Sequence, residues 1–102
     1  MTTRVVTSPE ADEDIRRIDA WWRDQRPAAP GLFAEELTEA IALVATTPEM
    51  GRRYAPAGVP GLRRVLLRAT RYHVYYVTDG DLVTVLAIWS AVRGRSPRLQ
   101  RP

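Results

Sequence analysis

Several residue types are missing from this sequence, and each absence removes a class of function. The 102 residues include no cysteine, no lysine and a single histidine, His73. Without cysteine the chain forms no disulfide bond, carries out no thiol catalysis and builds no cysteine-ligated zinc site. One histidine rules out a histidine-rich metal centre. We therefore expect neither a metal nor a cofactor.

Long hydrophobic runs are absent as well. No apolar stretch approaches the roughly 20 residues that a membrane-spanning helix needs, and the first residues lack the apolar core and cleavage site of a signal peptide. The sequence therefore predicts a cytoplasmic protein with no membrane partner.

Basic residues are scarce in the first half of the chain and acidic residues are scarce in the second half. Residues 1–51 carry five arginines and ten acidic residues, for a net charge of −5. Residues 52–102 carry ten arginines and two aspartates, for a net charge of +8. A one-sided basic field favours anionic partners such as nucleic acid or an acidic protein segment. The simpler alternative is a basic sheet face balanced by an acidic helical face.

The N-terminal half predicts a short strand and two helices. Residues 3–7 are rich in β-branched side chains, which is typical of a strand. Ser8 followed by Pro9 indicates a helix start, and the apolar stripe beyond it predicts a helix to about Arg26. A second stripe predicts a helix that ends before Pro48. Because the link between them is short, the helices should form an antiparallel hairpin.

The C-terminal half predicts β-structure. Residues 48–61 contain three prolines and three glycines and are expected to be a loop. The runs 62–69, 72–78 and 82–90 have strand composition, and Asp79-Gly80 is typical of a hairpin turn. The last run is apolar on both faces, which predicts a central strand.

The predicted element order is β-α-α-β-β-β in one domain over residues 1–95, with a flexible tail over 96–102. This order indicates the α+β class, with a short N-terminal strand and a helical hairpin packed on a small, twisted antiparallel sheet.

Arginines cluster on the first strand of the C-terminal half. Alternation places Arg64 and Arg68 on one face and Arg63 on the other. A guanidinium fork binds phosphate or carboxylate at two points. Arginines that alternate on an exposed strand are also typical of a merely solvated face.

His73 is the one side chain that titrates near neutral pH, which makes it a candidate general acid or base. The alternative is a structural role, because it lies inside a strand with no carboxylate paired to it. Of the adjacent Trp21 and Trp22, only one can point into the seam of the hairpin. An exposed tryptophan often anchors a partner chain, although both rings are equally well suited to closing the helix end against the sheet.

The order of several motifs resembles the RelE/ParE superfamily of toxins from bacterial type II toxin–antitoxin systems. The motifs are Ser8-Pro9-Glu10-Ala11, Asp14-Ile15 and Ile18, then Pro48 with Gly51-Arg52, Gly61-Leu62-Arg63, Tyr72-His73-Val74-Tyr75-Tyr76, and Val85-Leu86 with Ile88 and Arg93. The resemblance covers roughly residues 5–95 and implies the same helical hairpin on a sheet.

The resemblance implies a toxin that is neutralised by a cognate antitoxin. It also implies that the toxin contacts operator DNA only through this antitoxin. It also implies one of two targets. RelE-like members cleave messenger RNA on the ribosome, whereas ParE-like members inhibit DNA gyrase without nuclease chemistry. The positions that carry acid–base residues in many of the nucleases are here Tyr72, Ser90 and Ala91.

We therefore expect a ParE-like gyrase inhibitor that is not an enzyme, with Arg63, Arg64, Arg68 and Arg93 contacting the target. The alternative is a ribosome-dependent endoribonuclease in which His73 or Tyr72 carries the proton and these arginines hold the phosphate. A third possibility is a degenerate member that binds antitoxin but is not toxic. The antitoxin is expected near Trp21, Trp22 and Phe33, with acidic side chains on the arginine face.

Overall fold

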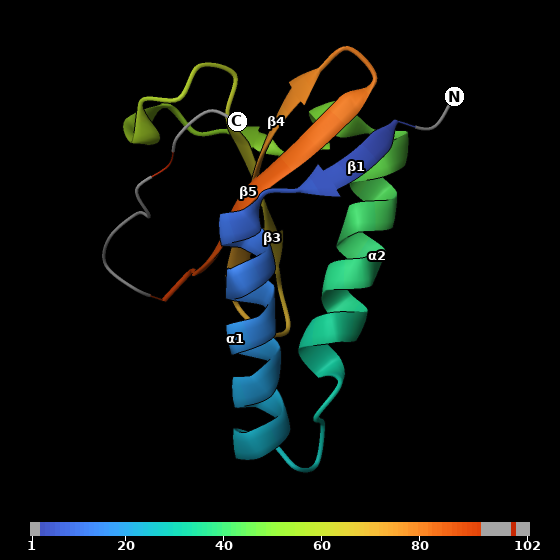
Figure 1. Cartoon of the computed structure of the whole chain (residues 1–102), viewed down its shortest axis with the longest axis vertical. Helices are drawn as coiled ribbons and strands as arrows, with labels where there is room; N and C mark the ends of the chain where they lie inside the picture. Colours follow the sequence, from blue (N-terminus) through green and yellow to red (C-terminus); the bar gives the residue numbers. More distant parts are fainter. Residues whose placement is uncertain (1–2, 93–98, 100–102) are drawn as a thin grey trace.

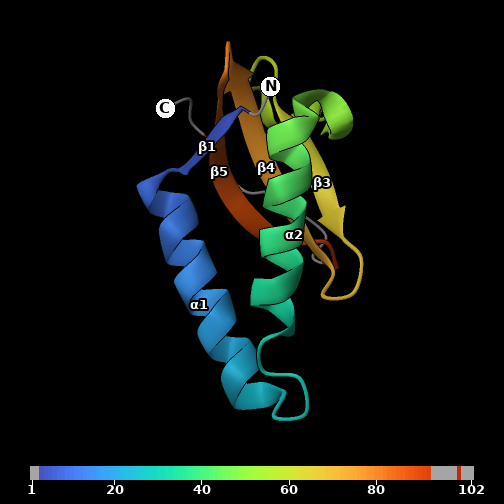
Figure 2. The same ribbon diagram turned by 90° about the vertical axis from the view of Figure 1, so that its right-hand side faces the viewer.

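Two helices cover one face of a β-sheet in the computed structural model, which describes residues 3–92 and Leu99 (Figure 1). Figure 2 shows α2 in front of the strands and α1 to their left. The elements are β1 (Arg4–Thr7), α1 (Pro9–Gln25), α2 (Leu32–Thr46), β2 (Arg52–Arg53), β3 (Arg63–Leu67), β4 (Tyr72–Asp79) and β5 (Leu82–Ser90). The predicted α+β class and helical hairpin are confirmed.

Local signals at the ends of α1 place this helix as predicted. The Ser8 hydroxyl accepts a hydrogen bond from the Ala11 backbone N–H at 3.1 Å, and Pro9 occupies the first turn, where its missing N–H costs nothing. The helix also bonds to the sheet, because the Asp14 carboxylate accepts the backbone N–H of Ile88 at 3.0 Å. The first helix is thereby fixed to the last strand.

The sheet is mixed, which corrects the predicted antiparallel arrangement. Its strand order is β1-β5-β4-β3-β2, and β1 runs parallel to β5 while the other neighbours are antiparallel. The chain continues along β5 beyond β1, since the Ser8 N–H donates to the Val85 carbonyl at 2.9 Å and its hydroxyl to the Leu86 carbonyl at 3.2 Å. The parallel direction brings the capping residue of α1 directly onto β5.

The segment 48–61 contains more structure than the predicted loop. Two 3-10 turns, Pro48–Met50 and Ala55–Ala57, flank the two-residue strand β2, which pairs with β3 through Arg52 with Arg64 and Arg53 with Arg63. The proline and glycine content correctly indicated turns, but pairing to a distant strand leaves no such local signal.

The core lies on both faces of the sheet, as the two-sided apolar pattern of residues 82–90 predicts. Phe33 and Tyr76 belong to the cluster under the helices, and Tyr75 and Leu62 to a second cluster on the opposite face. The β4–β5 register shifts at Tyr75/Tyr76, and Leu86 is the extra residue on β5. This bulge lets Leu86 and Ala87 both face the second cluster.

The turn before β5 and the tail after it were both predicted from the sequence. The turn at Gly80 is confirmed, with a φ of +61° between paired Asp79 and Leu82. Most of the predicted tail lies outside the described residues. Leu99, the one tail residue that the structure describes, packs against the second cluster.

Glu36 on α2 holds the turn between β3 and β4. Its carboxylate accepts the backbone N–H of Ala69 at 2.7 Å, and both the N–H and the hydroxyl of Thr70, at 2.9 and 2.6 Å. Desolvation raises the pKa of this carboxyl, but the hydrogen bonds from Thr70 and Ala69 outweigh it and the net pKa is lowered.

We predict that Glu36→Gln lowers the free energy of unfolding by about 1–2 kcal/mol at pH 7, because one acceptor oxygen and the charge are lost. Because the pKa of Glu36 is lower in the folded protein, its carboxylate stabilises the fold at pH values above the ordinary pKa of 4.5. This contribution is lost as the pH falls through the pKa of the folded state. Urea unfolding at pH 7 and pH 3 measures both effects. The two proteins should differ less at pH 3, and an equal difference at both values would contradict the role of the charge.

Candidate functional site

The β3–β4 hairpin separates its arginines between the two faces of the sheet, as alternation predicts. The Arg63 guanidinium donates to the backbone carbonyls of Glu49 and Gly51, at 3.1 and 2.8 Å. On the same segment the Tyr76 hydroxyl accepts the Gly51 N–H at 2.9 Å and donates to the Pro48 carbonyl at 2.8 Å. Arg63 therefore anchors the segment that leads into β2.

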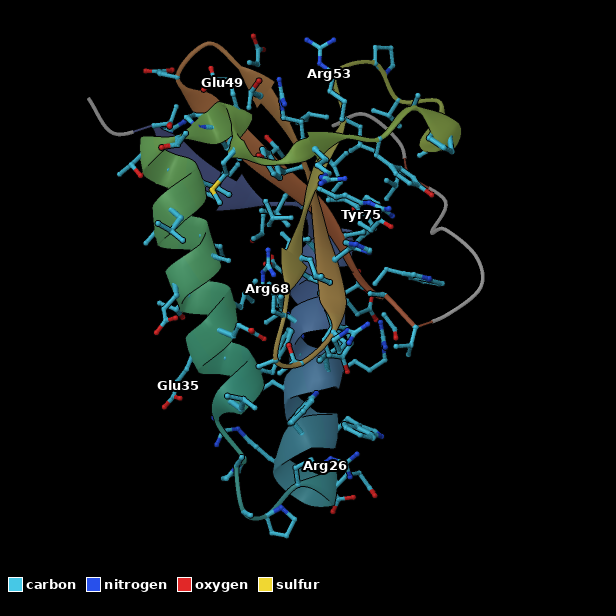
Figure 3. All side chains as sticks on the ribbon, turned by 180° about the vertical axis from the view of Figure 1, so that it is seen from behind. Arg26, Glu35, Glu49, Arg53, Arg68 and Tyr75 are labelled. Carbon is cyan, nitrogen blue, oxygen red and sulfur yellow. The ribbon has the colours of Figure 1, made fainter. Side chains whose placement is uncertain are left out.

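Arg64 lies on the opposite face, against two tyrosines. Its guanidinium stacks 4.1 Å from the centre of the Tyr54 ring and donates to the Tyr75 hydroxyl at 3.2 Å. Such stacking fixes the cation while its remaining N–H groups stay available. Figure 3 shows this side of the molecule, with Tyr75 and Arg68 over the strands.

Around Arg64 the surface forms a shallow hollow of about 460 Å³. We call it the arginine face; it is lined by Met50, Arg52, Arg64, Val65, Leu66, Arg68 and His73. None of these side chains is acidic, while Met50 and Leu66 are exposed apolar groups. Three cations around exposed apolar atoms suit an anionic protein surface or a phosphate.

His73 lines the arginine face, beside Arg64 and Leu66. Its ring lies 6.0 Å from that of Tyr75, and within residues 3–92 and Leu99 no carboxylate contacts it. Desolvation and the nearby Arg64 lower the pKa of His73 below its ordinary value, so that the neutral form dominates at pH 7. Among the described residues no carboxylate is paired with it to orient the ring, as one usually is for a catalytic histidine.

Tyr72 faces the other side of the sheet. Its hydroxyl accepts the indole N–H of Trp22 at 3.2 Å, and its ring packs edge-on against Phe33 at 5.3 Å. The two candidate proton carriers, Tyr72 and His73, therefore point away from each other. Of the predicted site residues, the structure brings His73, Arg64 and Arg68 together on the arginine face, whereas Tyr72 and Arg63 lie on the other side of the sheet. Arg93 lies outside the described residues.

A second hollow of about 670 Å³ opens beside Tyr72, between the C-terminal half of α1, the β3–β4 turn and the end of β5. We call it the tryptophan pocket, because all three tryptophans of the chain line it. Its lining is Arg17, Ile18, Trp21, Trp22, Arg26, Ala69, Thr70, Arg71, Tyr72, Ile88, Trp89, Ser90 and Val92. Trp21 is 45% exposed, and Arg26 lies over its ring at 5.1 Å.

One predicted contact residue is not accessible. Phe33 has no exposed surface, because it points from α2 into the main core against Tyr72. Phe33 belongs to the apolar stripe of its helix, and that periodicity already indicated a buried side chain. The predicted contact surface is therefore reduced to Trp21 and Trp22, the latter being half-buried.

The sequence analysis did not single out Arg26 and Trp89, which line the tryptophan pocket, and it did not predict that Tyr54 would support Arg64 or that Arg71 would border this pocket. These residues come from loops, turns and element ends that are distant in sequence, so no spacing motif connects them. In the part of the chain that the structure describes, no three His, Cys, Asp or Glu side chains are placed to hold a metal ion. None of its helices has the length and apolar character needed to span a bilayer.

Comparison with solved structures gives the same fold. One neighbour, from the chromosomal ParDE toxin–antitoxin system of P. aeruginosa, superposes with a TM-score of 0.71 at 17% identity, covering 87% of this chain and 96% of that one. A mutant of the E. coli toxin RelE in the free state superposes with a TM-score of 0.59 at 20% identity, covering 90% and 86%.

A curated relative is the tRNA-specific 2-thiouridylase MnmA of Kocuria rhizophila, 31% identical over 78 residues. These residues are 76% of this chain but 20% of that protein, so the chain spans about a fifth of its length. The family model of the ParE toxin of type II toxin–antitoxin system parDE matches residues 5–94. The chain therefore belongs to the ParE toxin family, within the RelE/ParE superfamily.

Proposed function

We propose that this chain is a toxin that inhibits DNA gyrase by binding to it, without nuclease chemistry, and that a cognate antitoxin neutralises it. Any contact with operator DNA is made through the antitoxin. The proposal starts from membership of the ParE family and depends on the arrangement of the candidate site residues.

The observation that carries the proposal is the separation of the groups that a nuclease needs to combine. Cleavage by a ribose 2′-hydroxyl needs a proton acceptor, a proton donor and cations around one phosphate. Tyr72 lies in the tryptophan pocket, whereas His73 lies on the arginine face beyond the sheet. Arg63 is engaged with backbone carbonyls. A phosphate on the arginine face would meet His73, Arg64 and Arg68, but neither Tyr72 nor Arg63.

The arginine face suits protein contact instead. Arg64 is held by Tyr54 and Tyr75 before any partner arrives, which lowers the entropic cost of binding. Exposed Leu66 and Met50 supply apolar area next to it, and Arg68 adds a second cation at the rim. A fixed arginine beside apolar groups is typical of an interface hot spot. We assign this face to the target.

The direct test is supercoiling by purified gyrase in the presence of the purified toxin. We expect inhibition that is relieved when the antitoxin is added first. In cells, induction of the toxin alone should stop DNA synthesis before protein synthesis, as measured by parallel pulse labelling. Unchanged supercoiling at large excess of toxin would contradict the proposal. Normal growth with soluble toxin present would instead indicate a degenerate, non-toxic member.

A double variant tests the absence of nuclease chemistry. We predict that Tyr72→Phe combined with His73→Ala remains toxic within about threefold, because neither side chain is required to move a proton. Toxicity is measured as the inducer concentration that halves the growth rate, with the amount of soluble protein matched by immunoblotting. Loss of toxicity together with loss of cuts within messenger RNA would establish the ribonuclease alternative.

A further inference from the structure

Arg71, in the turn between β3 and β4, has an unusual backbone. Its φ is +67°, and no other residue except glycine has a positive φ among those that the structure describes. The conformation is held on both sides, because its N–H donates to the Leu67 carbonyl and its carbonyl accepts the Ala91 N–H, each at 2.8 Å. Glycine or asparagine would adopt this left-handed conformation with less strain. An arginine here is a candidate for a functional role of its side chain.

The position of Arg71 indicates what that role is. The turn borders the tryptophan pocket, whose rim also carries Arg17 on α1, paired with Asp14 at 2.9 Å, and Arg26 at the C-terminal cap of α1. The Arg71 side chain is exposed. The Arg26 guanidinium stacks on the exposed ring of Trp21 and donates one N–H to the Gln25 carbonyl at 3.4 Å, which leaves its other in-plane N–H groups for a carboxylate. The pocket therefore has a cationic rim supplied by two separate elements.

The floor of the pocket distinguishes a protein ligand from a nucleic acid. Ile18 and Ile88 lie at its base, and the exposed side chain of Val92 is at its end. A single-stranded nucleic acid is typically held on flat aromatic platforms in a groove that follows its phosphates. Aliphatic and indole surface enclosed by arginines matches an apolar stripe flanked by carboxylates.

We propose that the tryptophan pocket is the docking site of an acidic amphipathic segment of the antitoxin, and that Arg71 is a residue that determines the specificity of this contact. The inference rests on the proposed function for the existence of an antitoxin. It places the antitoxin on the side of the sheet opposite His73 and Arg64, so that neutralisation is separable from target binding.

The first test replaces Arg71 with residues that suit its backbone. Arg71→Gly and Arg71→Asn should leave the melting temperature unchanged or raise it, because left-handed strain is relieved. Both should weaken binding of the antitoxin encoded beside this gene by about tenfold or more in isothermal titration calorimetry, while Arg71→Lys retains part of the affinity. Unchanged affinity in both variants would overturn the role of Arg71. Arg53→Asn, another exposed arginine near a turn, serves as the matched control and should bind normally.

The second test uses the tryptophans themselves. Because all three line the pocket, acrylamide quenching of their fluorescence reports on this site and on no other part of the chain. With a tryptophan-free antitoxin, complex formation should reduce the quenching constant at least twofold. A tight complex without protection would overturn the pocket assignment while leaving the proposed function intact. No complex at all would mean that the proposed partner itself is wrong.

Other occupants give different results in the same assay. Protection that rises with toxin concentration alone would assign the pocket to a second copy of the chain. Protection by single-stranded RNA but not by the antitoxin would assign it to a nucleic acid. Either result would overturn the inference.

Discussion

Reversal of charge at Arg64 is expected to reduce gyrase inhibition at least 30-fold while the protein remains folded. In the native chain the guanidinium is already positioned by stacking on Tyr54 and by the hydrogen bond to Tyr75. A positioned arginine at an interface typically contributes about 2 kcal/mol or more, and Arg64→Glu adds repulsion from an acidic partner surface. The measurement is the toxin concentration that halves the rate of supercoiling.

Two other arginines are the controls for this experiment. Arg16 is exposed on α1, outside both hollows, so Arg16→Glu makes the same change in net charge and should leave inhibition within about twofold. Arg68 lines the arginine face but is more exposed than Arg64. Arg68→Glu should therefore have an intermediate effect. Equal losses for all three variants would indicate a nonspecific charge effect and contradict the assignment of the face.

The largest loss of stability is expected from Gly51→Ala, about 2–4 kcal/mol. A Cβ at Gly51 would lie 2.4 Å from the Tyr76 hydroxyl oxygen and 2.9 Å from two ring carbons. Tyr76 is completely buried and its hydroxyl bridges Pro48 and Gly51, so the ring cannot retreat without breaking both hydrogen bonds. Overpacking and unsatisfied buried groups both destabilise the fold.

Thermal unfolding measures this effect, and for a domain of this size the loss corresponds to a melting temperature lower by about 10 °C or more. Gly31→Ala is the matched control, because the nearest atom to its new Cβ is 4.0 Å away. It should change the stability by less than about 0.5 kcal/mol. A comparable loss in both variants would show that backbone effects of glycine, rather than the contact with Tyr76, determine the result.

Local chemistry explains why much of the fold could be predicted from the sequence. The cap formed by Ser8 and Pro9, the apolar stripes of both helices and the turn at Gly80 each depend on neighbours along the chain. The alternation that separates Arg63 from Arg64 is equally local. The parallel pairing of β1 with β5 was not predictable in this way, because it is decided by which strand has an edge available after the others have paired.

The candidate site was less predictable than the fold. Strand alternation indicated that Arg64 and Arg68 share a face, but the stacking on Tyr54 comes from a loop whose path is determined by Arg63 and Tyr76. The tryptophan pocket forms only where α1, a turn and a strand end converge. Nothing in the sequence indicates the positive φ of Arg71, since most left-handed positions carry glycine or asparagine.

The central position of β5 has a consequence for the synthesis of this protein. The last strand that the structure describes lies between β1 and β4 and contributes to both clusters; it accepts hydrogen bonds from Ser8, the cap of α1, and donates one to Asp14 on α1. A ribosome completes β5 after the other described strands, and until then β1 has no partner in the sheet. A nascent chain that stops before residue 82 therefore cannot assemble the fold. Interruption of translation before that point leaves β1 and the N-terminal cap of α1 without the strand to which they bond.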